Sequence, residues 1–84
     1  MIASILTIPQ SLDTKADDLF RRFVREADGI VDAYQLETES EIAVVSIWVS
    51  EAKRQAYMGS QLAADVAKAY PQGMRRLYSV RNVK

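Results

Sequence analysis

The segment 42–50 (IAVVSIWVS) constrains the fold more than any other part of the chain. Successive side chains of a strand point to opposite faces of the sheet. One face of this segment carries Ile42, Val44 and Trp48, and the other carries Ala43, Val45, Ile47 and Val49. An antiparallel sheet with water on one side would show polar residues on that side. The segment therefore predicts a strand with an apolar covering on both faces.

Three further strands are predicted from runs of β-branched and apolar residues, at 2–8, 30–37 and 74–83. Pro9 ends the first run because proline lacks the backbone donor that pairing needs. The polar stretch 38–41 (TESE) predicts a hairpin turn between the second strand and segment 42–50.

Two helices are predicted between these strands. An apolar stripe at helical spacing runs from Leu12 to Ala27, with Ser11 or Thr14 as its cap and Gly29 as its end. The second helix is predicted from about Glu51 to Tyr70, after a cap at Ser50. Its expected buried stripe consists of Ala52, Ala56, Leu62, Ala63, Val66, Ala67 and Tyr70. Gly59 and Ser60 fall inside this helix and indicate a kink or a short break.

The resulting order, β-α-β-β-α-β, is the ferredoxin-like pattern of the α+β class. It predicts a four-stranded antiparallel sheet with two helices on one face and a single domain over residues 1–84. Because the second and fourth strands are then the edges, acidic residues 28–51 and basic residues 66–84 would occupy opposite edges.

The composition excludes several kinds of site. The 84 residues include no cysteine and no histidine, which excludes disulfides, Cys/His zinc sites and Ser-His or Cys-His catalytic pairs. We therefore expect no metal and no cofactor. Eleven basic and eleven acidic residues cancel, so we expect neither nucleic acid nor a membrane as a partner. The N-terminal MIASILTIPQ lacks a basic leader, which predicts a cytoplasmic protein.

A chain of this length often needs a disulfide, a metal or a partner chain for stability. Here the partner chain remains, and the first strand is also apolar on both faces, with Ile2, Leu6 and Ile8 opposed by Ala3 and Ile5. We therefore predict a homodimer whose sheets pack face to face, giving a dimeric α/β barrel. The alternative is a sheet whose alternation is simply loose.

The element order and the stretch SIWVSEAKRQAYMGSQLAADVAKAY resemble the dimeric α/β-barrel proteins, above all the antibiotic biosynthesis monooxygenase-like branch. In that branch a tryptophan near the end of the third strand precedes an acidic, alanine-rich entry into the second helix. Trp48 matches the tryptophan, and Ser50, Glu51 and Ala52 match the entry. The resemblance implies either a cofactor-independent monooxygenase or a protein that binds an apolar or aromatic small molecule.

The resemblance also names candidate catalytic residues. Trp48 would be a pocket wall, and Tyr57 a hydrogen-bonding group at the place where the family often has histidine. Haem-degrading relatives use an asparagine on the first strand, this tryptophan and that histidine. Here no asparagine precedes Asn82, so haem degradation is not expected.

Each candidate also has a purely structural interpretation. Trp48 could fill the core between sheet and helices, and Tyr57 could lie on a helix surface. Ser46 could open space for a ligand beside Trp48, or be a core serine bonded to backbone. Tyr34 and Tyr78 could line either the pocket or the dimer seam.

A second resemblance concerns stand-alone ligand-binding domains of the Lrp/AsnC kind. They share the element order and the sheet-on-sheet assembly, and VDAYQLETESEIAVVSIWV is similar to their second and third strands. Their usual hairpin glycine and aspartate are missing at Glu39, Ser40 and Glu41. This resemblance implies a non-catalytic module that binds a small effector.

Overall fold

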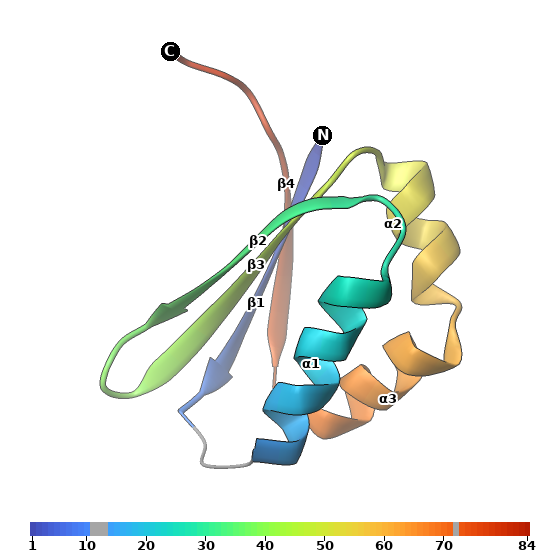
Figure 1. The fold of residues 1–84 in the computed structure, drawn as a ribbon. Helices are drawn as coiled ribbons and strands as arrows, with labels where there is room; N and C mark the ends of the chain where they lie inside the picture. The colour runs from blue at the N-terminus through green and yellow to red at the C-terminus, as the bar shows by residue number, and fades with distance from the viewer. Residues whose placement is uncertain (11–13, 72) are drawn as a thin grey trace.

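Strands and helices follow the predicted order, except that the second helical segment is divided. The computed structural model describes residues 1–10, 14–71 and 73–84. The elements in chain order are β1 (Ile2–Pro9), α1 (Thr14–Glu26), β2 (Ile30–Glu37), β3 (Glu41–Trp48), α2 (Glu51–Met58), α3 (Gln61–Ala69) and β4 (Met74–Ser79). The strands form one antiparallel sheet in the order β2-β3-β1-β4, and the helices lie on one side of it (Figure 1). This confirms the α+β ferredoxin-like fold class.

The short break that Gly59 and Ser60 indicate in the sequence is confirmed, because the second helical segment ends at Met58 and begins again at Gln61. The Ser60 hydroxyl accepts a hydrogen bond from the backbone N–H of Ala63 at 3.1 Å, which begins a new helix. Ser50 caps α2 in the same way, accepting from the N–H of Lys53 at 3.2 Å, as predicted.

The break also changes which residues are buried. No residue of α2 is buried, and Ala52, Ala56 and Ala67 of the expected stripe are exposed. Only Ala63 and Val66 of that stripe are fully buried. The two shorter helices therefore do not share the continuous buried stripe that was expected of one long helix.

The first helix ends as the sequence predicts. Gly29 adopts a φ of 113°, in the region that favours glycine, and a Cβ there would lie 2.8 Å from Cβ of Lys53. The expected N-terminal stripe residue Leu12 and the cap Ser11 lie outside the described residues, and the side chains of residues 14–17 are not described.

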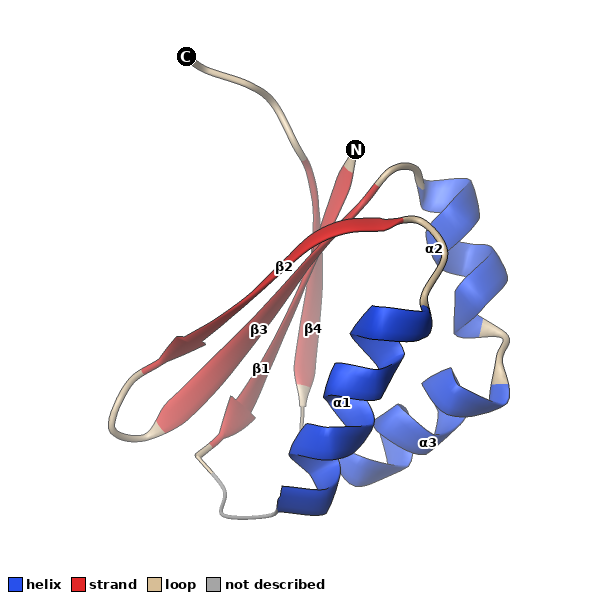
Figure 2. Ribbon diagram, in the orientation of Figure 1, coloured by secondary structure: helices blue, strands red, loops and turns tan. Residues whose placement is uncertain are grey.

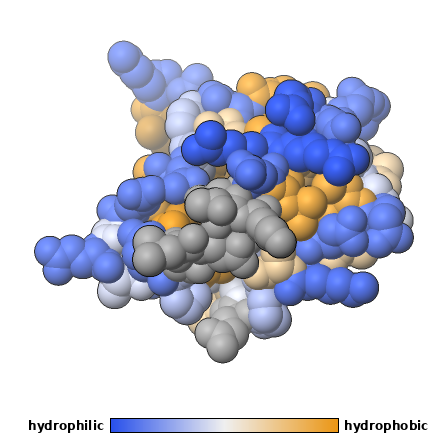
Figure 3. All heavy atoms as spheres, turned by 60° about the horizontal axis from the view of Figure 1, so that its bottom comes forward, coloured by the Kyte–Doolittle hydropathy of each residue, from blue (hydrophilic) through white to orange (hydrophobic). Residues whose placement is uncertain are grey.

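The core lies between the helices and one face of the sheet (Figure 2). One buried cluster consists of Phe23, Ala27, Trp48, Ala63 and Val66. A second consists of Leu6, Ile8, Ile42 and Val44, and Phe20 and Tyr70 pack against both clusters. At the end of the molecule that lies lowest in Figure 1, apolar residues show between the charged side chains (Figure 3).

The other face of the sheet has no helix over it, and we call it the open face. The strand register places Ile5, Val45 and Ile47 there, together with the exposed Tyr34 and Tyr78. Both faces of β3 are therefore apolar, as predicted. The strands β2 and β4 are the two edges, which also confirms the prediction.

Candidate functional site

Trp48 lies at the end of β3, on the helix side of the sheet, and has no exposed surface. Its indole Nε1 donates a hydrogen bond to Oγ of Ser46 at 3.2 Å. The two residues are neighbours on one face because side chains alternate along a strand. Ser46 itself is 6 % exposed, so it is the buried acceptor that satisfies the indole.

Three aromatic rings meet above this part of the sheet. Phe23 of α1 contacts Trp48 edge to face with ring centroids 6.1 Å apart, and contacts Tyr57 of α2 in the same way at 5.1 Å. The rings of Trp48 and Tyr57 are 6.2 Å apart. These separations lie in the range in which aromatic pairs attract each other. We call Phe23, Trp48 and Tyr57 the aromatic cluster.

Tyr57 is the half-buried member of this cluster. Burial raises the pKa of its phenol, the charge of Glu26 adds to the increase, and Arg22 opposes it. The hydroxyl therefore stays protonated at neutral pH. Tyr57 is suited to donate a hydrogen bond to a ligand, and it is not a base.

Ser4 and Arg75 form a partly buried polar contact that the sequence did not predict. Nη1 of Arg75 donates to Oγ of Ser4 at 2.8 Å, and Ser4 is 1 % exposed. In the register of β1 and β3, Ser4 stands directly opposite Ser46. Arg75, Ser4, Ser46 and Trp48 thus form a polar strip across the helix face of the sheet.

The sequence indicates only part of this polar strip. Ser4 interrupts the apolar strand 2–8 just as Ser46 interrupts 42–50. Their pairing depends on the strand register, and the contact with Arg75 joins residues 71 positions apart. Neither the pairing of the two serines nor the contact with Arg75 can be predicted from the pattern of neighbouring residues.

The charge of Arg75 has no acidic partner in the described part of the chain. Although the residue as a whole is exposed, its guanidinium turns inward to Ser4. Burial lowers the pKa of Arg75, and the nearby charge of Arg54 lowers it further.

Arg54 differs from Arg75 in having a partner. It donates from Nε and Nη2 to both carboxylate oxygens of Glu51, at 3.2 and 3.0 Å, and only 12 % of its side chain is exposed. The hydrogen bonds from Arg54, followed by the one from Gln55, lower the pKa of Glu51.

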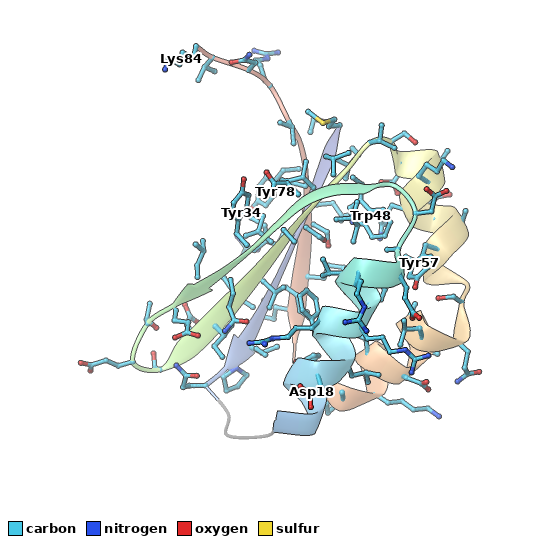
Figure 4. The ribbon with its side chains drawn as sticks, in the orientation of Figure 1. Asp18, Tyr34, Trp48, Tyr57, Tyr78 and Lys84 are labelled. Carbon is cyan, nitrogen blue, oxygen red and sulfur yellow. The ribbon has the colours of Figure 1, made fainter. Side chains whose placement is uncertain are left out.

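Tyr34 and Tyr78 lie on the open face, across the sheet from Trp48 and Tyr57 (Figure 4). The Tyr34 hydroxyl donates to the carboxylate of Asp32, and this bond is the main cause that raises its pKa. The structure therefore brings together Ser46, Trp48 and Tyr57 among the five predicted site residues. Tyr34 and Tyr78 do not join that group.

Three cavities are lined by described residues. A groove of about 340 Å³ separates α1 from the edge strand β2, and a shallow hollow of about 250 Å³ on the open face includes Tyr78. A third cavity, of about 160 Å³, lies between α3 and the strands β1 and β4, and Arg75 lines it. Neither Trp48 nor Tyr57 lines any of these three.

Within residues 1–10, 14–71 and 73–84, no group of three acidic side chains gathers in a way that could hold a metal ion. No helix among these residues is both long and apolar enough to cross a membrane.

The fold is that of antibiotic biosynthesis monooxygenase-like proteins. SnoaB, a cofactor-independent oxygenase from Streptomyces nogalater, superposes with a TM-score of 0.76 at 12% identity, over 98% of this chain and 93% of that one. Rv0793 from Mycobacterium tuberculosis gives a TM-score of 0.71 at 15% identity, over 96% and 95%.

A crystal structure described as antibiotic biosynthesis monooxygenase gives a TM-score of 0.68 at 13% identity, over 98% of this chain and 100% of that one. The sequence matches no family model and, at a significant level, no curated protein. At these identities the likeness establishes the fold, and the expected resemblance is confirmed at that level.

Proposed function

We propose that this protein binds an apolar or aromatic small molecule and acts on it as a cofactor-independent monooxygenase of the antibiotic-biosynthesis type. The observation that carries the proposal is the aromatic cluster, in which the half-buried Tyr57 packs against the rings of Phe23 and Trp48 and keeps its hydroxyl protonated. The likeness to SnoaB supports the choice of chemistry.

The reaction needs few chemical groups from the protein. An acidic phenolic substrate loses a proton from an activated carbon to solvent. The resulting carbanion adds O₂, and the peroxide anion takes a proton back from solvent to form a hydroperoxide. Loss of water then leaves a carbonyl, so the substrate supplies all the electrons. The protein contributes by holding the anion, donating a hydrogen bond to it and excluding water. Tyr57 supplies the donor, and the polar strip places the positive charge of Arg75 on the same side of the sheet.

Oxygen uptake with a panel of phenolic polyketides tests this proposal. Wild-type protein is expected to consume oxygen with at least one member, and Tyr57→Phe to lower the rate by about a hundredfold, as the loss of one hydrogen-bond donor to a developing anion does. Trp48→Phe is expected to lower it as well. Ala56→Ser, at an exposed position beside Tyr57, is the control. Absence of turnover over the whole panel contradicts the oxygenase proposal.

A second candidate function is that of a non-catalytic module that binds a small effector, as in stand-alone Lrp/AsnC ligand-binding domains. It is favoured by the complete burial of Trp48 and by cavities that are lined by other residues. Ligand binding without oxygen uptake would select this candidate.

We also propose that a second copy of the chain covers the open face, giving a homodimer. Large side chains there are half exposed in the single chain, with Tyr34 at 53% and Leu36 at 58%. A patch of this kind marks an interaction surface. The β2 edge carries acids and the β4 edge carries bases, so a two-fold pairing would bring opposite charges together.

We also infer from the composition that the protein is cytoplasmic. The chain has no cysteine, which agrees with a reducing compartment.

A further inference from the structure

The cavity beneath α3 has the size of one aromatic ring. Its volume is about 160 Å³, and its apolar lining includes Leu6, Val66 and Tyr70. An apolar cavity of about 150 Å³ in another protein accepts benzene. Gly73 also lines the cavity, and no larger residue fits there, since a Cβ at that position would lie 2.7 Å from Cδ1 of Leu6. The strand β4 therefore enters close to β1 and keeps the cavity small.

One charge reaches this apolar space. Arg75 is the single charged residue among those described in the lining, and no described carboxylate pairs with it. A charge that is partly withdrawn from water and unpaired is costly. Arg54, the other guanidinium nearby, is paired with Glu51 and, being positive, cannot balance the charge of Arg75. An anion in the cavity would relieve this cost.

The geometry of Arg75 is suited to hold such an anion. A guanidinium has five N–H donors in a fixed fork, and Ser4 takes the hydrogen bond of Nη1 at 2.8 Å. That bond fixes the side chain and leaves donors for a carboxylate, which a guanidinium binds in bidentate fashion. One unpaired positive charge matches a monoanion.

We propose that this cavity binds a small aromatic monoanion, a single-ring carboxylate of the benzoate kind, with its ring against Leu6, Val66 and Tyr70 and its carboxylate on Arg75. The inference goes beyond the proposed function, because neither Trp48 nor Tyr57 lines this cavity. It does not depend on the oxygenase chemistry.

Calorimetric titration of the full chain tests the proposal, with benzoate and its neutral isostere benzamide as probes. Benzoate is expected to bind, and benzamide to bind at least about tenfold more weakly, the usual effect of losing a charge-assisted contact. Equal affinity for benzoate and benzamide, or no benzoate binding, overturns the proposal.

Two pairs of variants locate the site. Arg75→Gln is expected to weaken benzoate binding by about tenfold or more, while Arg76→Gln, on the opposite face of the same strand, leaves it unchanged. Ala67→Leu fills the cavity from the exposed side of α3 and is expected to abolish binding, while Ala64→Leu, on the same helix but outside the lining, does not.

Circular dichroism and sedimentation of each variant show whether its fold and assembly match the wild type. Unchanged binding in folded Arg75→Gln shows that this arginine serves only to satisfy Ser4. Because these titrations need no oxygen, benzoate binding without turnover of phenols would contradict the oxygenase proposal and leave this inference standing. Turnover without benzoate binding would do the reverse.

Discussion

The hydrogen bond between Trp48 and Ser46 illustrates how a single hydroxyl stabilises the candidate site. The indole is fully buried, and Ser46 is its recorded acceptor. From the sequence alone, Ser46 could either open space for a ligand or be a core serine bonded to backbone. The structure gives a third answer, because the partner is a side chain two positions away.

Ser46→Ala therefore should lower stability by about 1–3 kcal/mol, the cost of leaving a buried donor without an acceptor. The measurement is the free energy of unfolding in urea at one fixed protein concentration. Ser79→Ala, at an exposed position on β4, serves as the control and should change stability little. A loss in Ser46→Ala no greater than in the control would show that water replaces the hydroxyl.

At the scale of elements, the break between α2 and α3 has two possible causes, the conformational freedom of Gly59 and the helix cap formed by Ser60. The two residues are adjacent in the sequence, so the sequence does not distinguish these causes. Gly59 has φ −82° and ψ −2°, which any residue adopts, and a Cβ there would meet nothing closer than 3.8 Å. Ser60 is extended and caps α3. The serine cap, and not the freedom of glycine, marks the division.

Substitutions at these two positions should have opposite signs. Gly59→Ala is expected to raise stability by about 0.4–1 kcal/mol, because it restricts the unfolded chain at a compatible conformation. Ser60→Ala is expected to lower it by about 1 kcal/mol through loss of the cap. Thermal and urea unfolding of both variants would test this, and a destabilising Gly59→Ala would show that the break needs glycine.

At the scale of the whole molecule, the open face is the surface that the proposed dimer would bury. Val45 lies at the centre of this face, on a strand with neighbours on both sides. Burial of this face against a second copy would remove large apolar side chains from water, at about 25 cal/mol for each Å² of apolar surface.

Sedimentation at micromolar concentration should therefore show a wild-type dimer. Val45→Glu should shift the protein to monomer or aggregate, since a charge in an apolar interface has no partner. Ala64→Glu introduces the same charge on the exposed side of α3 and should leave the dimer intact. A stable wild-type monomer in ordinary salt would contradict the proposed dimer.

The element order, the two apolar faces of β3, the edge strands and the caps at Ser50 and Gly29 were all predictable. They follow from periodicity and turn chemistry, which act within a few residues. The break at Gly59 and Ser60 was predictable as well. The continuous buried stripe across it was not found, because packing decides which side of each shorter helix is buried.

The candidate site was predictable only where it lies on one strand or one helix. Ser46, Trp48 and Tyr57 were found from local pattern, but Ser4 and Arg75 were missed. Their contact forms through strand pairing between residues 71 positions apart, and the ring-sized cavity beside it forms where α3, β1 and β4 meet. The sequence by itself determined the fold, because periodicity is local. Only the tertiary structure decided which polar and charged groups share a face and a cavity, because register and packing join distant parts of the chain.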